Sequence, residues 1–95
     1  MNALHQSYDQ IVRSIQGHVN YKEGGHASWF IGRRNPVTAQ LLARERSILL
    51  VDTWNCSFND AQKIIKHFVS KGMVLDEGPL QINAANGVYI YRRSD

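Results

Sequence analysis

The chain has 95 residues, of which 43% are hydrophobic and 20% are charged, and its formal net charge at pH 7 is +3. A chain of this length buries one hydrophobic core, which excludes a multidomain protein, and its composition excludes intrinsic disorder. The longest apolar run, residues 48–51, is too short to cross a bilayer, and the first residues lack the pattern of a secretory signal. A single cysteine allows no internal disulfide, so we expect a cytoplasmic protein of one domain, residues 1–95, without membrane contact.

Apolar residues recur at helical spacing near the start of the chain and predict a first amphipathic helix over residues 3–16. These residues are Leu4, Tyr8, Ile11, Val12 and Ile15. We expect this helix to end near residue 17, a glycine, and to pack its apolar side in the core. A seam between two copies of the chain is the alternative use of that side.

A turn, a strand and a second helix are predicted next. Gly24 and Gly25 favour a turn, and residues 28–31 are rich in strand-forming side chains. Asn35 suits the N-cap of a helix, and Pro36 suits the first helical position, where the N–H that proline lacks has no partner anyway. The second helix should therefore run from Pro36 to about residue 45 or 46.

Residues 47–53 allow more than one structure. Their four consecutive apolar residues, 48–51, favour a buried strand. The same residues could extend the second helix or form the first helix of a helix-turn-helix motif, and so short a run has no periodicity that decides. The fold depends on this segment.

A third helix is predicted over residues 57–71. Ser57 can accept a hydrogen bond from the amide of Asp60, whose carboxylate also complements the positive end of the helix. Gly72 suits a left-handed C-cap, with Met73 packed back onto the last turn. One apolar stripe faces the core. It consists of Phe58, Ala61, Ile64, Ile65, Phe68 and Val69.

A β-hairpin is predicted over residues 80–93. A three-residue loop over residues 85–87, with Gly87 left-handed, would place Ile82 opposite Ile90 and keep the apolar side chains on one face. A two-residue turn at residues 86–87 would divide them between the two faces. In either register, Tyr89 and Tyr91 lie on the face opposite Ile90.

Residues 57–93 resemble the second half of winged helix-turn-helix DNA-binding domains. The resemblance rests on the third helix, its Lys71-Gly72-Met73-Val74 exit and a returning strand over residues 88–92. It implies an α+β fold with three helices and a C-terminal β-hairpin, and a first helix of the motif around residues 48–54. The alternative is an α/β sandwich in which a strand over residues 47–52 pairs with the hairpin.

The same resemblance implies a small basic transcriptional regulator that binds duplex DNA, with two copies acting as a homodimer. The third helix would enter the major groove, and the hairpin would contact the DNA backbone. Asn and Gln side chains can pair with adenine, whereas Lys and Arg can meet guanine or phosphate. The predicted DNA-binding residues are Asn59, Gln62, Lys63, Lys66, Asn83, Arg92 and Arg93.

Other functions follow from other features. A protein–protein interaction module, such as a phage-type inhibitor or adaptor, fits a short chain without catalytic motifs. RNA binding through Tyr89 and Tyr91 is a weaker alternative. If residues 47–52 form a strand, Asp52, Cys56 and His67 could be imagined as a catalytic group with a stabilised thiolate, but such residues are more commonly structural. We therefore predict no enzymatic activity and no cofactor. We also predict no metal site, because the histidines and the cysteine do not occur at the spacing of metal ligands.

Overall fold

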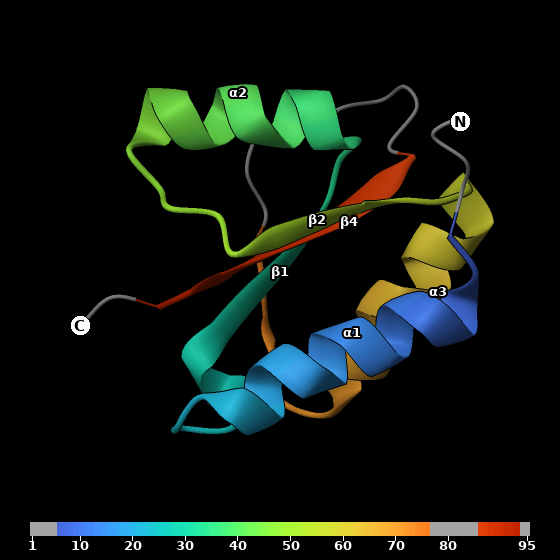
Figure 1. The fold of residues 1–95 in the computed structure, drawn as a ribbon, viewed down its shortest axis with the longest axis vertical. Helices are drawn as coiled ribbons and strands as arrows, with labels where there is room; N and C mark the ends of the chain where they lie inside the picture. Colours follow the sequence, from blue (N-terminus) through green and yellow to red (C-terminus); the bar gives the residue numbers. More distant parts are fainter. Residues whose placement is uncertain (1–5, 77–85, 94–95) are drawn as a thin grey trace.

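The computed structural model describes residues 6–76 and 86–93, which form three α-helices, one short 3-10 helix and four strands (Figure 1). In chain order the elements are α1 (Tyr8–Tyr21), η1 (His26–Ser28), β1 (Trp29–Arg33), α2 (Pro36–Arg46), β2 (Asp52–Asn55), α3 (Phe58–Ser70), β3 (Val74–Leu75) and β4 (Gly87–Arg92). The α+β class and the three helices that the sequence predicts are confirmed.

The four strands form one mixed sheet in the order β2-β4-β1-β3. β4 runs antiparallel to both β1 and β2, whereas β1 and β3 are parallel. α1 and α3 lie side by side on one face of the sheet, and α2 lies alone on the other face (Figure 1). Within residues 6–76 and 86–93, no helix is long and apolar enough to cross a membrane.

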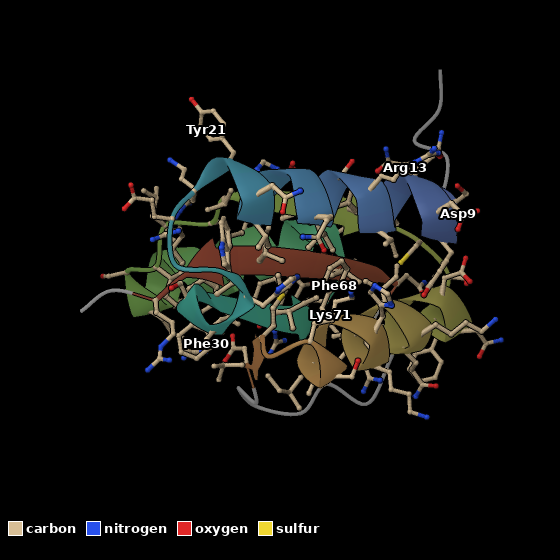
Figure 2. All side chains as sticks on the ribbon, turned by 90° about the horizontal axis from the view of Figure 1, so that it is seen from below. Asp9, Arg13, Tyr21, Phe30, Phe68 and Lys71 are labelled. Carbon is tan, nitrogen blue, oxygen red and sulfur yellow. The ribbon has the colours of Figure 1, made fainter. Side chains whose placement is uncertain are left out.

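Alternating strand side chains fill two cores, one on each face of the sheet. The larger core lies against α1 and α3, and Phe68 sits inside it between the two helices, whereas Tyr21 projects away from the end of α1 (Figure 2). The strands contribute Trp29, Ile31, Trp54, Val88 and Ile90 to this core. The smaller core lies beneath α2, and its side chains include Phe30, Ala39, Leu42, Tyr89 and Tyr91.

α1 begins and ends later than predicted. Ser7 and Gln10 form a reciprocal capping box, with N–O distances of 3.2 and 3.0 Å, which fixes the first turn. The helix continues past Gly17 to Tyr21 because Val19 is buried in the core, which offsets the cost of an exposed helical glycine. The prediction of a helix over residues 3–16 was therefore wrong at both ends, because residues 6 and 7 are not helical, and residues 1–5 lie outside the described part of the chain.

α2 has the predicted boundaries. The Asn35 side chain accepts a hydrogen bond from the Thr38 amide at 2.8 Å, and Pro36 occupies the first turn. The helix ends at Ser47, which adopts the left-handed conformation with φ of 55°. Two apolar residues of this helix, Val37 and Leu41, are 69% and 54% exposed.

The segment before α3 is not helical. Residues 48–51 have no regular secondary structure, and residues 52–55 form β2, which pairs with β4. The first motif helix that the winged-helix resemblance implies around residues 48–54 is therefore absent. The strand that the alternative fold placed at residues 47–52 exists, but it lies a few residues later.

The predicted hairpin register was wrong. Ile90 has Ile31 on one side and Asp52 on the other, so both neighbouring positions in the sheet are occupied by residues far away in the sequence. Residues 80–84, the predicted first strand of the hairpin, lie outside the described residues. Gly87 does not adopt a positive φ but belongs to β4. A Cβ at Gly87 would lie 2.5 Å from the Arg34 carbonyl oxygen, so this glycine permits a close backbone approach and not a turn.

Candidate binding site

α3 has the capped start and the glycine end that its sequence predicts. The Ser57 hydroxyl accepts a hydrogen bond from the Asp60 amide at 3.1 Å. At the other end Gly72 has a φ of 116°, and the Met73 amide donates to the Phe68 carbonyl at 3.0 Å while the Met73 side chain is buried. Both ends of α3 are thus fixed by local hydrogen bonds.

The apolar stripe of α3 is wider than the core requires. Ala61, Ile64 and Phe68 are completely buried between α3, α1 and the sheet. Ile65 is half-buried on the flank of the helix, and Val69 remains 39% exposed. The outer edge of the stripe is therefore available on the surface beside β3.

A hollow of about 540 Å³ lies along this flank, and we call it the α3 groove. Its walls come from α3, from the end of β1 and from β3. The lining residues are Arg33, Asn59, Gln62, Lys63, Ile65, Lys66, Val69 and Leu75. Apolar side chains form part of its surface, and three of the lining residues are cations.

The charge of the α3 groove has one sign. Among the described residues, none that lines the groove is acidic, and neither Arg33, Lys63 nor Lys66 forms an ion pair. The Arg33 guanidinium lies 5.0 Å from the centre of the Phe58 ring, which orients it at one end of the groove. The groove is therefore suited to an anionic ligand.

Four of the predicted DNA-binding residues meet in the α3 groove: Asn59, Gln62, Lys63 and Lys66. Sequence reasoning missed Arg33, which stands two residues after the buried Ile31 and so points to the face that α3 covers. It also missed Leu75, whose register opposite Ile31 follows only from the parallel pairing of β1 and β3.

The two predicted hairpin arginines lie elsewhere. Arg92 pairs with Trp29 at the start of β1, whereas Arg33 of the α3 groove is at the other end of that strand. The Arg92 Nη1 donates to the Glu23 carbonyl at 2.9 Å, and the Arg93 Nη1 donates to the Ala27 carbonyl at 3.1 Å. These arginines therefore do not extend the groove, and Asn83 lies outside the described residues.

The aromatic face proposed for RNA stacking is not on the surface. Tyr89 and Tyr91 are 2% and 7% exposed beneath α2. The Tyr89 hydroxyl donates to the Asp76 carboxylate at 2.5 Å, and burial together with this carboxylate raises the pKa of Tyr89. Unpaired bases cannot reach these rings, so that alternative was wrong.

The residues considered for catalysis are not assembled. Asp52 Oδ2 lies 3.0 Å from His18 Nε2, and His67 packs edge-on against the Phe68 ring. Cys56 is completely buried, and burial followed by the nearby charge of Asp60 raises the pKa of its thiol to about 11. The suggested stabilised thiolate was therefore wrong. Among the described residues, no group of three or more histidine, cysteine, aspartate or glutamate side chains could hold a metal ion.

The chain was compared with protein-family models, with curated proteins and with solved structures. No family model, no curated protein and no solved structure matches it. Its candidate function therefore rests on the geometry of its own surface.

Proposed function

We propose that the protein is an interaction module, without enzymatic activity, that binds an acidic amphipathic segment of a partner protein in the α3 groove. The observation that carries the proposal is the combination, in one hollow, of exposed apolar side chains with three cations that form no ion pair with any described residue. Acidic side chains of the partner would meet Arg33, Lys63 and Lys66 at the rim. Its apolar side chains would cover Val69 and Leu75, which are 39% and 41% exposed.

Peptide selection tests this proposal without a known partner. A random peptide library is selected for binding to the protein, and we expect the recovered peptides to combine acidic with apolar residues. Lys66→Glu should weaken their binding about tenfold, because it places a like charge against the acidic side chains. Val69→Ser should weaken it about threefold through loss of apolar contact.

Lys71→Glu is the matched control, because Lys71 is exposed at the end of the same helix and does not line the groove. The peptides should bind this variant about as tightly as the wild type. Recovered peptides without an acidic excess, or peptides that bind Lys66→Glu as well as they bind the wild type, would contradict the proposal.

Duplex DNA is the second candidate, favoured by the arrangement of Asn59, Gln62, Lys63 and Lys66 on one exposed side of α3. Such a side can present amide and basic groups to a major groove. This candidate predicts binding that weakens steeply with added salt, and Lys66→Ala should reduce the slope of log K against log salt by about one unit. Two copies would then act together, as in a regulator, because one small module buries little surface on DNA.

Measuring duplex binding as a function of salt concentration separates the two candidates. Binding of random-sequence duplex at low salt, with the predicted change of slope, would favour DNA over the protein partner. Binding of the selected acidic peptides, together with no detectable binding of duplex DNA, would favour the interaction module. Either partner is compatible with the cytoplasmic location that the single cysteine favours.

A further inference from the structure

A second hollow, of about 630 Å³, lies at the end of the sheet where β1 begins and β4 ends. Four parts of the chain meet there: the residue after α1, β1, the connection between α2 and β2, and the end of β4. We call it the β4-end pocket. Its volume falls in the range of small-molecule sites, about 300–1,000 Å³.

One wall of the β4-end pocket is apolar. The rings of Phe30 and Tyr91 stack there, with their centres 4.9 Å apart and their planes 21° apart. Leu49 and Val51 also line the pocket and are 87% and 37% exposed. A single exposed leucine is ordinary, but these two aliphatic side chains border the same pocket as the stacked rings. An apolar ligand body would cover Phe30, Leu49 and Val51 together, while the nearly buried Tyr91 supports the Phe30 ring.

The polar residues of the pocket include Lys22, Arg92 and Arg93, and none of the lining residues in the described part of the chain is acidic. Both guanidinium groups are held in place by backbone carbonyls, with N–O distances of 2.9 Å from Arg92 to Glu23 and 3.1 Å from Arg93 to Ala27. The Arg92 guanidinium also lies 5.4 Å from the centre of the Trp29 ring. A guanidinium has five N–H donors, so each arginine keeps donors for a ligand and loses little freedom on binding.

We infer that the β4-end pocket binds a small anion, a phosphate or a carboxylate, that carries a flat apolar body. Arginine pairs with both anions through two parallel hydrogen bonds. The apolar body would lie against Phe30, Leu49 and Val51, accessible apolar residues of the pocket. This site is independent of the proposed function, because it shares no residue with the α3 groove and lies at the other end of β1. It also gives Arg92 and Arg93 a role other than the predicted contact with a DNA backbone.

Four probes test the inference by backbone-amide NMR titration of the full chain. The probes are 1-naphthyl phosphate, 1-naphthoate, inorganic phosphate and the uncharged 1-naphthalenemethanol. We expect saturable shifts around the pocket with naphthyl phosphate, naphthoate or both, and the stronger of the two identifies the anion. Inorganic phosphate and the alcohol should each bind at least about tenfold more weakly. The phosphate ion lacks the apolar body, and the alcohol lacks the anionic group.

Variants locate the site. Arg93→Gln should weaken binding of the better naphthyl probe about tenfold through loss of charge-assisted hydrogen bonds. Leu49→Ser should weaken it about threefold, and the exposure of Leu49 ensures that the fold does not depend on this side chain. Arg13→Gln is the control, because Arg13 is an exposed arginine near the start of α1 that does not line the pocket (Figure 2).

Three results would overturn the inference. They are the absence of saturable shifts at the pocket with millimolar naphthyl probes, equal binding of inorganic phosphate and naphthyl phosphate, and equal affinity of wild type and Arg93→Gln. Melting curves that match the wild type establish that each variant is folded when its affinity is measured.

Discussion

At the scale of single residues, Gly32 shows how a missing side chain shapes a core. A Cβ at this position in β1 would lie 2.3 Å from Cζ and 2.4 Å from the hydroxyl oxygen of Tyr89. The Tyr89 ring therefore occupies the space of a side chain, and from there its hydroxyl reaches the Asp76 carboxylate. The packing of the smaller core beneath α2 therefore requires that residue 32 has no side chain.

We predict that Gly32→Ala destabilises the protein by about 1–3 kcal/mol, because the buried ring and its hydrogen bond must shift. Such a loss would lower Tm by about 4–8 °C for each kcal/mol, measured by circular dichroism. Gly17→Ala is the matched control. This glycine lies inside α1 with nothing within 4 Å of an added Cβ, so alanine should stabilise by about 0.5–1 kcal/mol. Equal melting of Gly32→Ala and the wild type would contradict the account of Tyr89.

The buried thiol of Cys56 provides a second prediction at this scale. Its side chain is completely buried and its pKa is raised to about 11, so both access and ionisation oppose reaction. We expect no reaction with a disulfide reagent at pH 8 in the folded protein, and one reactive thiol per chain in denaturant. Rapid labelling of the folded protein would show that the thiol is open to solvent.

At the scale of elements, the ends of the helices could be read from the sequence where one local contact determines them. Ser57 and Asp60, or Asn35 and Thr38, are three residues apart, and their hydrogen bonds form in the structure. Gly72 likewise ends α3 through contacts within its last turn. By contrast, the capping box of Ser7 and Gln10 was overlooked, although it uses the same local chemistry.

We predict that Ser57→Ala costs about 1 kcal/mol of folding free energy, because the Asp60 amide loses its acceptor. Ser14→Ala is the control, since Ser14 is an exposed residue inside α1 where alanine is the better helix former. Chemical denaturation should therefore move the midpoint down for Ser57→Ala and leave it equal or higher for Ser14→Ala. An equal decrease of the denaturation midpoint in both variants would contradict the capping role of Ser57.

The pairing of strands could not be read from the sequence. Periodicity places Val88 and Ile90 on one face and Tyr89 and Tyr91 on the other, and the structure agrees. It does not say which strands lie beside them, because the partners come from residues 29–33 and 52–55, more than 30 positions away. The α3 groove was half predicted for the same reason: its helical residues share a local spacing, but Arg33 and Leu75 join them only through the sheet.

At the scale of the whole molecule, His26 joins three parts of the fold. It begins η1, its Nε2 lies 3.1 Å from Gln16 Oε1 of α1, and its ring stacks on Phe68 of α3 with the centres 6.1 Å apart. Burial, followed by the charges of Lys71 and His67, lowers the pKa of His26. The neutral imidazole is thus the form that fits the folded state.

This lowered pKa sets the sign of a pH effect. Because the unfolded chain binds the His26 proton more readily than the folded one, His26 stabilises fully above its unfolded pKa of about 6.5, and stability falls as the pH drops below it. We predict a decrease in Tm between pH 7.5 and pH 5 that becomes shallower in His26→Gln. Adding salt should reduce only the part due to Lys71 and His67, since salt does not restore the hydration lost on burial. Parallel Tm curves for wild type and variant would contradict this role of His26.

The position of β4 has a consequence for biosynthesis. Translation delivers β4 last of the four described strands, yet β4 lies between β1 and β2 and provides the link between them (Figure 1). Before residues 87–92 emerge from the ribosome, β1 and β3 are the only described strands that can pair as they do in the finished fold. A nascent chain stopped short of Gly87 would leave uncovered the apolar side chains of α2 and α3 that pack on β4, and exposed apolar surface of this kind favours chaperone binding. The four-stranded sheet is thus completed only late in synthesis, when a single six-residue strand joins β1 to β2.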